Sequence, residues 1–426
     1  SEFPFPGPYP FYFANLEAVY PEGVGPQNKI FTRSDLEALL APLPENIKKI
    51  DELLEAAKTK GMDVRYPLVS RTVLQRYQTE VFDMFRDDHP EHARRTGEFL
   101  LECAGRTQQE LENLLENPDF LPRVPEISLE NLTCRDGSYF SGDRPVFFAG
   151  VCGWFNRGQF PQLSAMGYTC LSIELGPTAT LPSENEINPH GADGILDVMN
   201  AARENHMVCD LLVSPHYFPD WARQKWPSTD ATGWRTKTNN FMPWTITDPH
   251  FRAVIAKHLS VLIPLVREHP ALISYDLINE AWYRLIPDFP AEMWQKYQQE
   301  HPDLERWLAL AKMGTDSVTE FLQWFVAELH KYDTAHPVQI KAISTQEVLN
   351  VDREAIGDIL TANGMDAMPS WPDWTGRLAA DFTWPFLRHD YYRTLQPDHP
   401  ILDGEYHISD GLFPTPASYF TAALWG

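Results

Sequence analysis

Two glutamates, Glu280 and Glu405, each end an apolar segment of the sequence and could act as a pair. Glu280 ends "ALISYDLINE" and Glu405 ends "PILDGE". If both segments are strands of one closed barrel, the two carboxylates can face each other across its mouth. Such a pair can hydrolyse a glycoside, because one carboxyl group protonates the leaving oxygen while the other attacks the anomeric carbon. The sequence therefore predicts Glu280 and Glu405 as catalytic residues.

The alternation of side chains along a strand adds an internal check on this pair. If Glu280 points into the barrel, Ile278 and Asp276 do so too, because side chains alternate with a period of two. If Glu405 points inward, so does Asp403, about 6–7 Å deeper. Asp403 is therefore an alternative nucleophile.

Amides, carboxylates, histidines and indoles gather at the ends of the same apolar segments. Their polar groups can bind hydroxyls, and the indole faces can stack on pyranose rings. We predict as substrate-binding residues Trp154, Asn156, Glu174, His216, Tyr217, Asn279, Trp282, Trp371 and His407.

Several of these residues have a structural alternative. His216 and His407 either bind sugar hydroxyls or hold a loop. Trp282 and Trp371 either stack on sugar or fill the core. Glu174 either contacts substrate or pairs with a nearby arginine.

The elements that position these residues alternate between strands and helices. Near-continuous apolar runs predict strands at 145–152, 168–175, 207–215, 271–279, 338–344, 365–370 and 400–405. Amphipathic stretches such as 191–206 and 251–269 lie between them. This alternation predicts an α/β fold, a (β/α)8 TIM barrel, with its functional groups at the carboxyl ends of the strands. A small hairpin over 134–150 leads into the barrel.

Only seven barrel strands can be counted before the chain ends. An open barrel would leave unpaired strand edges. We therefore expect the eighth strand in a further part of the polypeptide, as a separate or missing segment. Residues 131–426 are the predicted, C-terminally incomplete barrel.

Residues 1–130 are predicted as a Pro/aromatic-rich segment and a helical extension. Capping boxes are predicted at Ser34 with Glu37 and at Thr107 with Glu110. A helix is expected to begin at Pro44 and to end before Gly61.

Composition and motif content argue against several classes of protein. The net charge of −24 argues against nucleic acid or an anionic membrane as a partner. No apolar run is long enough to span a bilayer, and no signal peptide is visible, which leaves a cytoplasmic location or a periplasmic or secreted one after signal removal. The five scattered cysteines predict no disulfide framework, and Cys152, Cys170 and Cys209 are expected to be buried. Neither an HxH metal motif on the first strand nor a phosphate loop occurs, so no metal or cofactor is predicted.

The Asn-Glu pair at the end of the fourth strand and the Glu at the end of the seventh resemble clan A of the glycoside hydrolases. The hairpin "DGSYFSGDRPVFFAG" and the stretch "ITDPHFRAVIAKHLSVLIPLVREHPALISYDLINEAW" are similar to the same clan. The loop after Trp282 is similar to family 42 β-galactosidases. The resemblance implies that Glu280 is the general acid/base, that Glu405 is the nucleophile and that Asn279 binds the substrate 2-hydroxyl.

The chain departs from the clan at two positions. The clan often has an arginine near the end of strand two, where this chain has Glu174, and a tyrosine on strand six, where it has Ser370 and Trp371. The expected function is a retaining β-glycosidase acting on oligo- or polysaccharides, with β-galactosides ahead of β-glucosides and β-mannosides. The alternatives are a non-catalytic carbohydrate-binding barrel and an inverting hydrolase. An oligomer is compatible with either function.

Overall fold

We describe the protein from a computed structural model. The described residues are 31–86, 90–122, 128–152, 157–165, 167–229, 244–279, 291–342, 352–366 and 389–404. The chain divides into two compact units, Ser1–Val124 and Pro125–Gly426.

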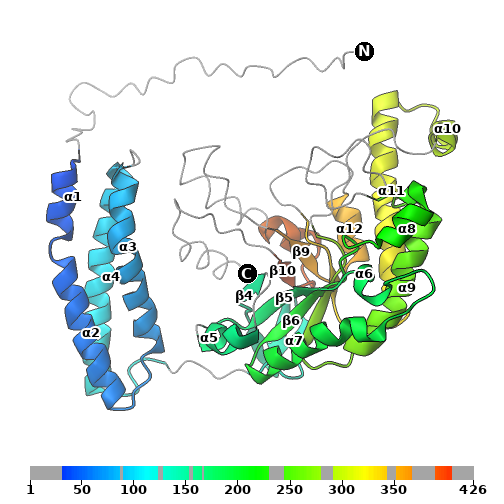
Figure 1. Ribbon diagram of the computed structural model, residues 1–426. Helices are drawn as coiled ribbons and strands as arrows, with labels where there is room; N and C mark the ends of the chain where they lie inside the picture. Colours follow the sequence, from blue (N-terminus) through cyan, green and yellow to red (C-terminus); the bar gives the residue numbers. More distant parts are fainter. Residues whose placement is uncertain are drawn as a thin grey trace, which may run out of the picture. The chain divides into compact units, whose positions relative to one another are not determined.

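The first unit is helical in its described part. Its helices are α1 (Arg33–Leu40), α2 (Leu43–Thr59), α3 (Arg65–Arg86) and α4 (Pro90–Glu116). Helices α2, α3 and α4 pack against one another, and α1 packs on α4 (Figure 1). Each helix buries one apolar stripe, which includes Leu36, Ile50, Leu74 and Leu100. The helical extension therefore has its own core.

The starts of these helices differ from the predicted capping boxes. The N-cap of α1 is Thr32, whose hydroxyl accepts the Asp35 N–H at 3.2 Å while the Asp35 carboxylate accepts the Thr32 N–H at 2.9 Å. Thr107 lies inside α4, where it is fully buried and donates to the carbonyl of Cys103. The predictions at Ser34 and Thr107 were wrong, because a capping motif in sequence can also occur within a helix. The expected helix end was confirmed, since Gly61 follows α2 with φ of 71°.

The second unit contains parallel strands that follow one another in chain order. They are β4 (Gly150–Cys152), β5 (Cys170–Glu174), β6 (Val208–Leu212), β7 (Leu272–Asp276) and β8 (Val338–Gln339), followed by the pair β9 (Asn363–Met365) and β10 (Ile401–Asp403). Backbone N–H groups of Ala362 and Asp366 donate to the carbonyls of Val338 and Ala342, so β9 continues the sheet beside β8. The described strands form a partial (β/α)8 barrel, as predicted.

Every predicted barrel strand overlaps an observed one, with one correction. The segment predicted as a single strand over 145–152 is divided between the hairpin strand β3 (Arg144–Val146) and the barrel strand β4. The apolar run spans the end of one strand and the start of the next, so it does not mark the break between them.

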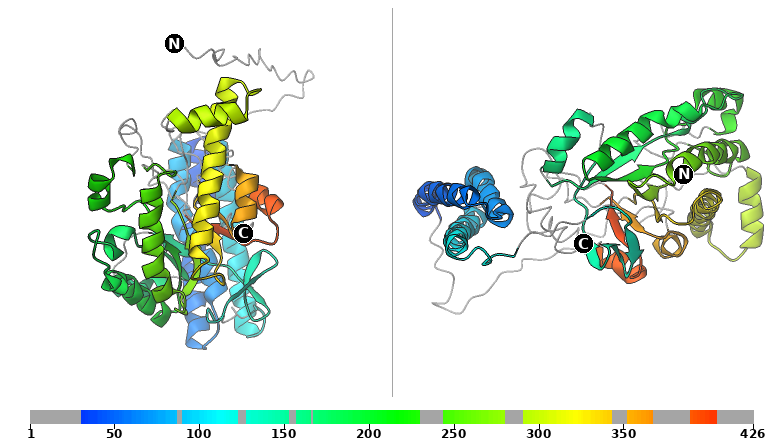
Figure 2. Two further views of the ribbon diagram at one scale, coloured as in Figure 1. Left: turned by 90° about the vertical axis from the view of Figure 1, so that its right-hand side faces the viewer. Right: turned by 90° about the horizontal axis from the view of Figure 1, so that it is seen from below.

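Helices cover the outer face of the sheet. The long ones are α7 (Asp193–Glu204), α9 (Pro249–Val266) and α11 (Arg306–Leu329), which lie outside the strands in Figures 1 and 2. Shorter elements are η1 (Arg157–Gln159), α5 (Phe160–Ala165), α6 (Pro177–Thr180), η2 (Pro189–Ala192), α8 (Asp220–Lys225), η3 (Pro227–Thr229), α10 (Ala291–Glu300) and α12 (Arg353–Ile359). Leu211, Leu259 and Phe325 are fully buried between sheet and helices.

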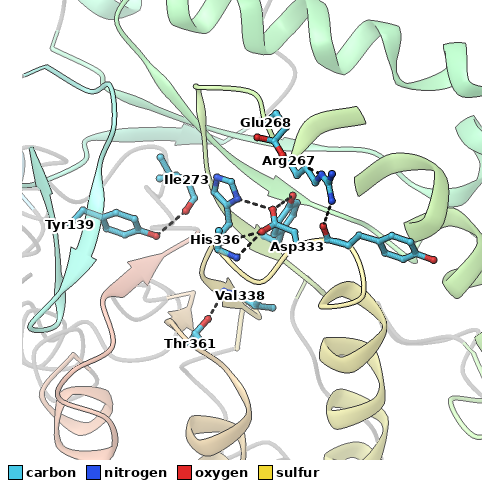
Figure 3. Close-up of polar contacts among 11 residues, drawn as sticks. Tyr139, Arg267, Glu268, Ile273, Asp333, His336, Val338 and Thr361 are labelled. Carbon is cyan, nitrogen blue, oxygen red and sulfur yellow. Dashed lines mark hydrogen bonds and ion pairs between the residues drawn. The ribbon is translucent and has the colours of Figure 1, made fainter. Parts of the chain in front are cut away.

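A three-stranded antiparallel sheet stands where a hairpin was predicted to lead into the barrel, and it covers the amino-terminal ends of the barrel strands. Its strands are β1 (Thr133–Arg135), β2 (Ser138–Ser141) and β3. Tyr139 is buried with Cys170, Val208 and Ile273, and its hydroxyl donates to the carbonyl of Ile273 at 3.3 Å (Figure 3). The opposite end of the strands therefore remains as the place for a functional site.

Polar contacts also tie β7 to the segment that leads into β8. The Asp333 carboxylate accepts the Tyr275 hydroxyl at 2.9 Å and pairs with the His336 ring at 2.7 Å (Figure 3). Burial opposes ionisation of Asp333, but these hydrogen bonds hold its pKa well below the usual range. The Thr361 hydroxyl accepts the Val338 N–H at 2.8 Å. These contacts hold the start of β8 in place beside β7.

Candidate active site

The described part of the candidate site lies where β5, β6 and β7 end. Glu174, the last residue of β5, accepts the Tyr217 hydroxyl at 2.9 Å and the Ser214 hydroxyl at 3.3 Å, one on each carboxylate oxygen. Tyr217 is 46% exposed. Partial burial, and then the hydrogen bond to Glu174, raise the pKa of the Tyr217 phenol, so the hydroxyl stays protonated. The predicted residues Glu174 and Tyr217 therefore lie together, and the described partners of Glu174 are hydroxyls rather than an arginine.

The two loops that carry this pair touch through their backbones. A Cβ at Gly176 would lie 2.5 Å from the Tyr217 Cβ and 2.7 Å from the Ser214 carbonyl oxygen. The Thr178 N–H donates to the Tyr217 carbonyl at 3.1 Å. Ser214 has a φ of 27°, in the left-handed region that few residues other than glycine adopt. This strained turn directs the Ser214 hydroxyl to Glu174, a contact that the sequence did not predict.

His258 of α9 supports the loop after β5 from below. Its Nε2 bonds the Leu175 carbonyl at 3.1 Å, and its Nδ1 bonds the Thr180 hydroxyl at 2.7 Å. Because a carbonyl can only accept, the proton is on Nε2 and Nδ1 accepts from Thr180. Complete burial lowers the pKa of His258 to about 4, so the ring is neutral near pH 7.

His216 holds the end of β7. Its Nε2 accepts the backbone N–H of Asn279 at 3.2 Å. The imidazole stacks on Trp244, with ring centroids 5.6 Å apart, and Trp244 stacks on Phe251. The loop-holding alternative for His216 is therefore supported by its described contacts.

Asn279 presents a buried amide at the carboxyl ends of the strands, which form the rim of the barrel. The side chain is almost buried, and its Oδ1 has no hydrogen-bond partner among the described residues. Buried amide oxygens are nearly always satisfied, so a ligand hydroxyl is a suitable partner for this atom. The prediction that Asn279 binds substrate remains open and is compatible with this geometry.

Two polar layers fill the barrel interior beneath the rim. In the lower layer, the Asp210 carboxylate accepts the Ser274 hydroxyl and, at 3.1 Å, the Gln339 amide. Burial raises the pKa of Asp210, and these hydrogen bonds offset part of that effect. In the upper layer, Lys341 Nζ lies 3.8 Å from Asp276 Oδ2, and both side chains are buried.

Sequence reasoning missed most of this interior network. Asp276 was expected to point inward, but Asp210, Gln339 and Lys341 were not singled out. The available signal was a charged or amide residue inside an apolar strand, as in "VCDLLV" and "VQIKAI". Polar residues in such segments face either the barrel interior or a strand end.

The face of β10 differs from the expectation for Asp403. Leu402 packs in the interior cluster with Tyr139, whereas Ile401 packs on the outer core. Asp403 has the orientation of Ile401, and its Oδ2 lies 3.5 Å from Nε2 of the buried His389. The alternation thus places Asp403 on the helix side, a position that does not support its alternative assignment as nucleophile.

The same register has a consequence for Glu405. Strict alternation would place position 405 on the helix side as well, so an inward Glu405 requires the alternation to end. The strand does end at Asp403, and the chain bends at Gly404.

The remaining predicted site residues lie outside the described residues. They are Trp154, Asn156, Glu280, Trp282, Trp371, Glu405 and His407. Within the described ranges no three His, Cys, Asp or Glu side chains are grouped so that they could hold a metal ion. None of the described helices is long and apolar enough to cross a membrane.

Comparison with solved structures identifies the fold. The chain is similar to an exo-carrageenase of family GH42 from Bacteroides ovatus, with a TM-score of 0.62 and 16% identity over 91% of this chain and 63% of that one. It is also similar to a β-galactosidase from Rahnella sp. R3, with a TM-score of 0.53 and 16% identity over 63% of this chain and 46% of that one. The expected fold, a (β/α)8 barrel, is confirmed.

The chain spans about two thirds or less of the length of these proteins. No protein-family model and no curated protein matches the sequence.

Proposed function

We propose that this protein is a retaining β-glycoside hydrolase in which Glu280 is the general acid/base and Glu405 the nucleophile. One observation supports this most directly. The Lys341 side chain reaches from Asp276 of β7 to the backbone of Gly404 after β10. The segments that lead to Glu280 and Glu405 therefore come within reach of one lysine side chain. This proximity supports a retaining pair, whose carboxylates are about 5–5.5 Å apart, as the proposed arrangement.

The proposed reaction is a double displacement. Glu405 attacks the anomeric carbon while Glu280 protonates the departing oxygen, which leaves a covalent glycosyl-enzyme. Glu280 then deprotonates a water molecule that attacks the anomeric carbon, and the bond to Glu405 breaks. The sugar leaves with its original anomeric configuration, and both carboxyl groups return to their starting protonation states.

Rim residues support sugar recognition. Asn279 offers its amide oxygen to the 2-hydroxyl, and Glu174 with Tyr217 offers an acceptor and a phenol at the mouth. The proposal also retains as sugar-binding residues Trp154, Asn156, Trp282, Trp371 and His407. His216 supports the site through its hydrogen bond to the Asn279 N–H. The names of the two similar structures, an exo-carrageenase and a β-galactosidase, favour β-galactosides as substrates.

A panel of nitrophenyl β-glycosides tests the proposal, with β-galactoside, β-glucoside and β-mannoside arms and a carrageenan oligosaccharide arm. We expect wild type to release nitrophenol from at least one glycoside, and Glu280→Gln and Glu405→Ala to lose at least about 10³-fold in kcat. NMR of the first-formed anomer should show retention. Inversion, or full activity of Glu405→Ala, would contradict the mechanism.

A matched control is Asp403→Asn. This carboxylate lies on the helix side, so its loss should leave kcat within about threefold if the protein remains folded. Binding of sugars without any turnover by wild type would instead indicate a carbohydrate-binding barrel.

A further inference from the structure

Lys341 is a buried cation in the barrel interior. Its side chain is 2% exposed, and the carboxylate of its partner Asp276 is fully buried. Other acidic groups face this region from neighbouring strands: Asp210 on β6 contributes an attractive interaction with Lys341, and Asp366, directly after β9, is fully buried. A lysine among these carboxylates lowers their tendency to take up protons.

The Asp276–Lys341 pair is tied to the rim of β7. The second carboxylate oxygen of Asp276 accepts the Ile278 N–H at 3.2 Å. The Lys341 N–H donates to the Ile278 carbonyl at 3.1 Å, and the Leu277 N–H donates to the Gln339 carbonyl at 2.9 Å. The segment that ends in Asn279 is thus fixed by both partners of the ion pair.

The same lysine contacts the end of β10. A Cβ at Gly404 would lie 2.8 Å from both Cγ and Cε of Lys341. The absence of a side chain at Gly404 is therefore what allows the lysine stem to pass. Lys341 packs against both strand ends that lead to the proposed catalytic glutamates.

Stability alone does not account for an ammonium at this position. Replacing both partners of a buried ion pair by apolar residues is often neutral or stabilising, whereas removing one partner alone is strongly destabilising. The Asp276–Lys341 pair as a whole therefore calls for a role besides stability.

We propose that Lys341 is a positioning residue of the active site, which sets the geometry of the β7 and β10 rims and the electrostatic environment of the carboxylates between them. This inference rests on the proposed function, because it concerns the same site. It assigns Lys341 no contact with substrate.

The test compares Lys341→Met, Lys341→Arg and wild type on the glycoside that wild type cleaves. The expected result for Lys341→Met is a fall in kcat on the order of 10²-fold with KM changed less than about threefold, because positioning acts on the transition state. Loss of the cation raises the pKa of nearby carboxylates, so the acid limb of kcat/KM should move to higher pH. Lys341→Arg keeps the charge and should restore the acid limb.

The matched control is Lys257→Met, which removes an exposed lysine of α9 and should leave kcat and the pH profile unchanged. If Lys341→Met does not fold, Gly404→Ala tests the positional part of the inference, since it displaces the lysine stem and keeps the charge. In that variant kcat should fall while the acid limb of kcat/KM stays in place. Folding is followed by tryptophan fluorescence.

Two outcomes overturn the inference. In the first, wild type is active and the folded Lys341→Met variant has unchanged kcat and pH profile, or the Gly404→Ala variant in its place has unchanged kcat. This leaves the glycosidase proposal intact and removes the role of Lys341. A wild type without turnover on any glycoside removes both proposals together.

Discussion

The Tyr217 hydroxyl donates a 2.9 Å hydrogen bond to the Glu174 carboxylate and thereby joins the rim loops of β5 and β6. These residues are 43 positions apart in the chain. Their contact turns two separate strand ends into one surface. It also orients a carboxylate that a sugar hydroxyl could share.

Tyr217→Phe should weaken substrate binding while the barrel stays folded. The change removes the phenol that the proposal offers to a sugar hydroxyl, and loss of one such hydrogen bond corresponds to about 1–2 kcal/mol, or roughly a five- to thirtyfold rise in KM. Steady-state kinetics measures this. Tyr391→Phe, at another partly exposed tyrosine, is the control and should have no effect. An unchanged KM for Tyr217→Phe would show that the pair lies outside the substrate site.

Gly176→Ala should disturb the same rim by steric overlap. The new methyl group would lie 2.5 Å from the Tyr217 Cβ, so the two loops must separate, at a cost of about 1–3 kcal/mol. Gly194→Ala in α7 is the matched control, because nothing lies within 4 Å of its Cβ. Urea unfolding followed by tryptophan fluorescence reports on the barrel unit, since all 13 Trp residues lie after residue 124. Equal stability of the two variants would contradict the described packing.

The barrel should lose stability on mild acidification because of His258. Its folded pKa of about 4 is below the value of 6.5 for a free histidine, so the unfolded chain binds more protons between these values. The contribution of His258 to the free energy of unfolding is therefore complete above about pH 6.5, and it decreases as the pH falls toward 4. The loss between pH 7.5 and pH 5 should be about 2 kcal/mol.

His258→Gln tests this dependence. The free energy of unfolding of the variant should differ less between pH 7.5 and pH 5 than that of wild type, whatever its absolute stability. His190→Gln, at a side chain that is 83% exposed, should retain the wild-type difference. The same pH dependence in wild type and His258→Gln would exclude His258 as its source.

Thr32→Ala should destabilise the start of α1 by about 1 kcal/mol, because it removes the capping hydroxyl. Amide hydrogen exchange over residues 31–41, read by mass spectrometry, should be faster in this variant. Ser34→Ala is the control and should change exchange little, since Ser34 is not the N-cap. Faster exchange in the Ser34 variant alone would favour the capping box predicted from the sequence.

Strand order was predictable because the sequence of a buried parallel strand is a near-continuous apolar run. The seven runs and their amphipathic partners needed no long-range information, and the barrel followed from their alternation. Boundaries were less predictable at 145–152, where one apolar run serves both a hairpin strand and a barrel strand. Local propensity cannot distinguish two adjacent apolar strands from one.

The rim residues were partly predictable. Glu174, His216, Tyr217 and Asn279 were found because polar residues end apolar strands at the functional face of a parallel barrel. The partners of these residues were not, since the hydroxyls of Ser214 and Tyr217 reach Glu174 only through the approach of two loops.

The sequence by itself determined the fold class, the strand order and the residue types at the strand ends, because apolar periodicity and chain order are local properties. Only the tertiary structure decided the face of Asp403, the burial of Lys341 beside Asp276 and its passage over Gly404. Those features depend on register between strands far apart in the chain, and register is set by packing rather than by any one segment.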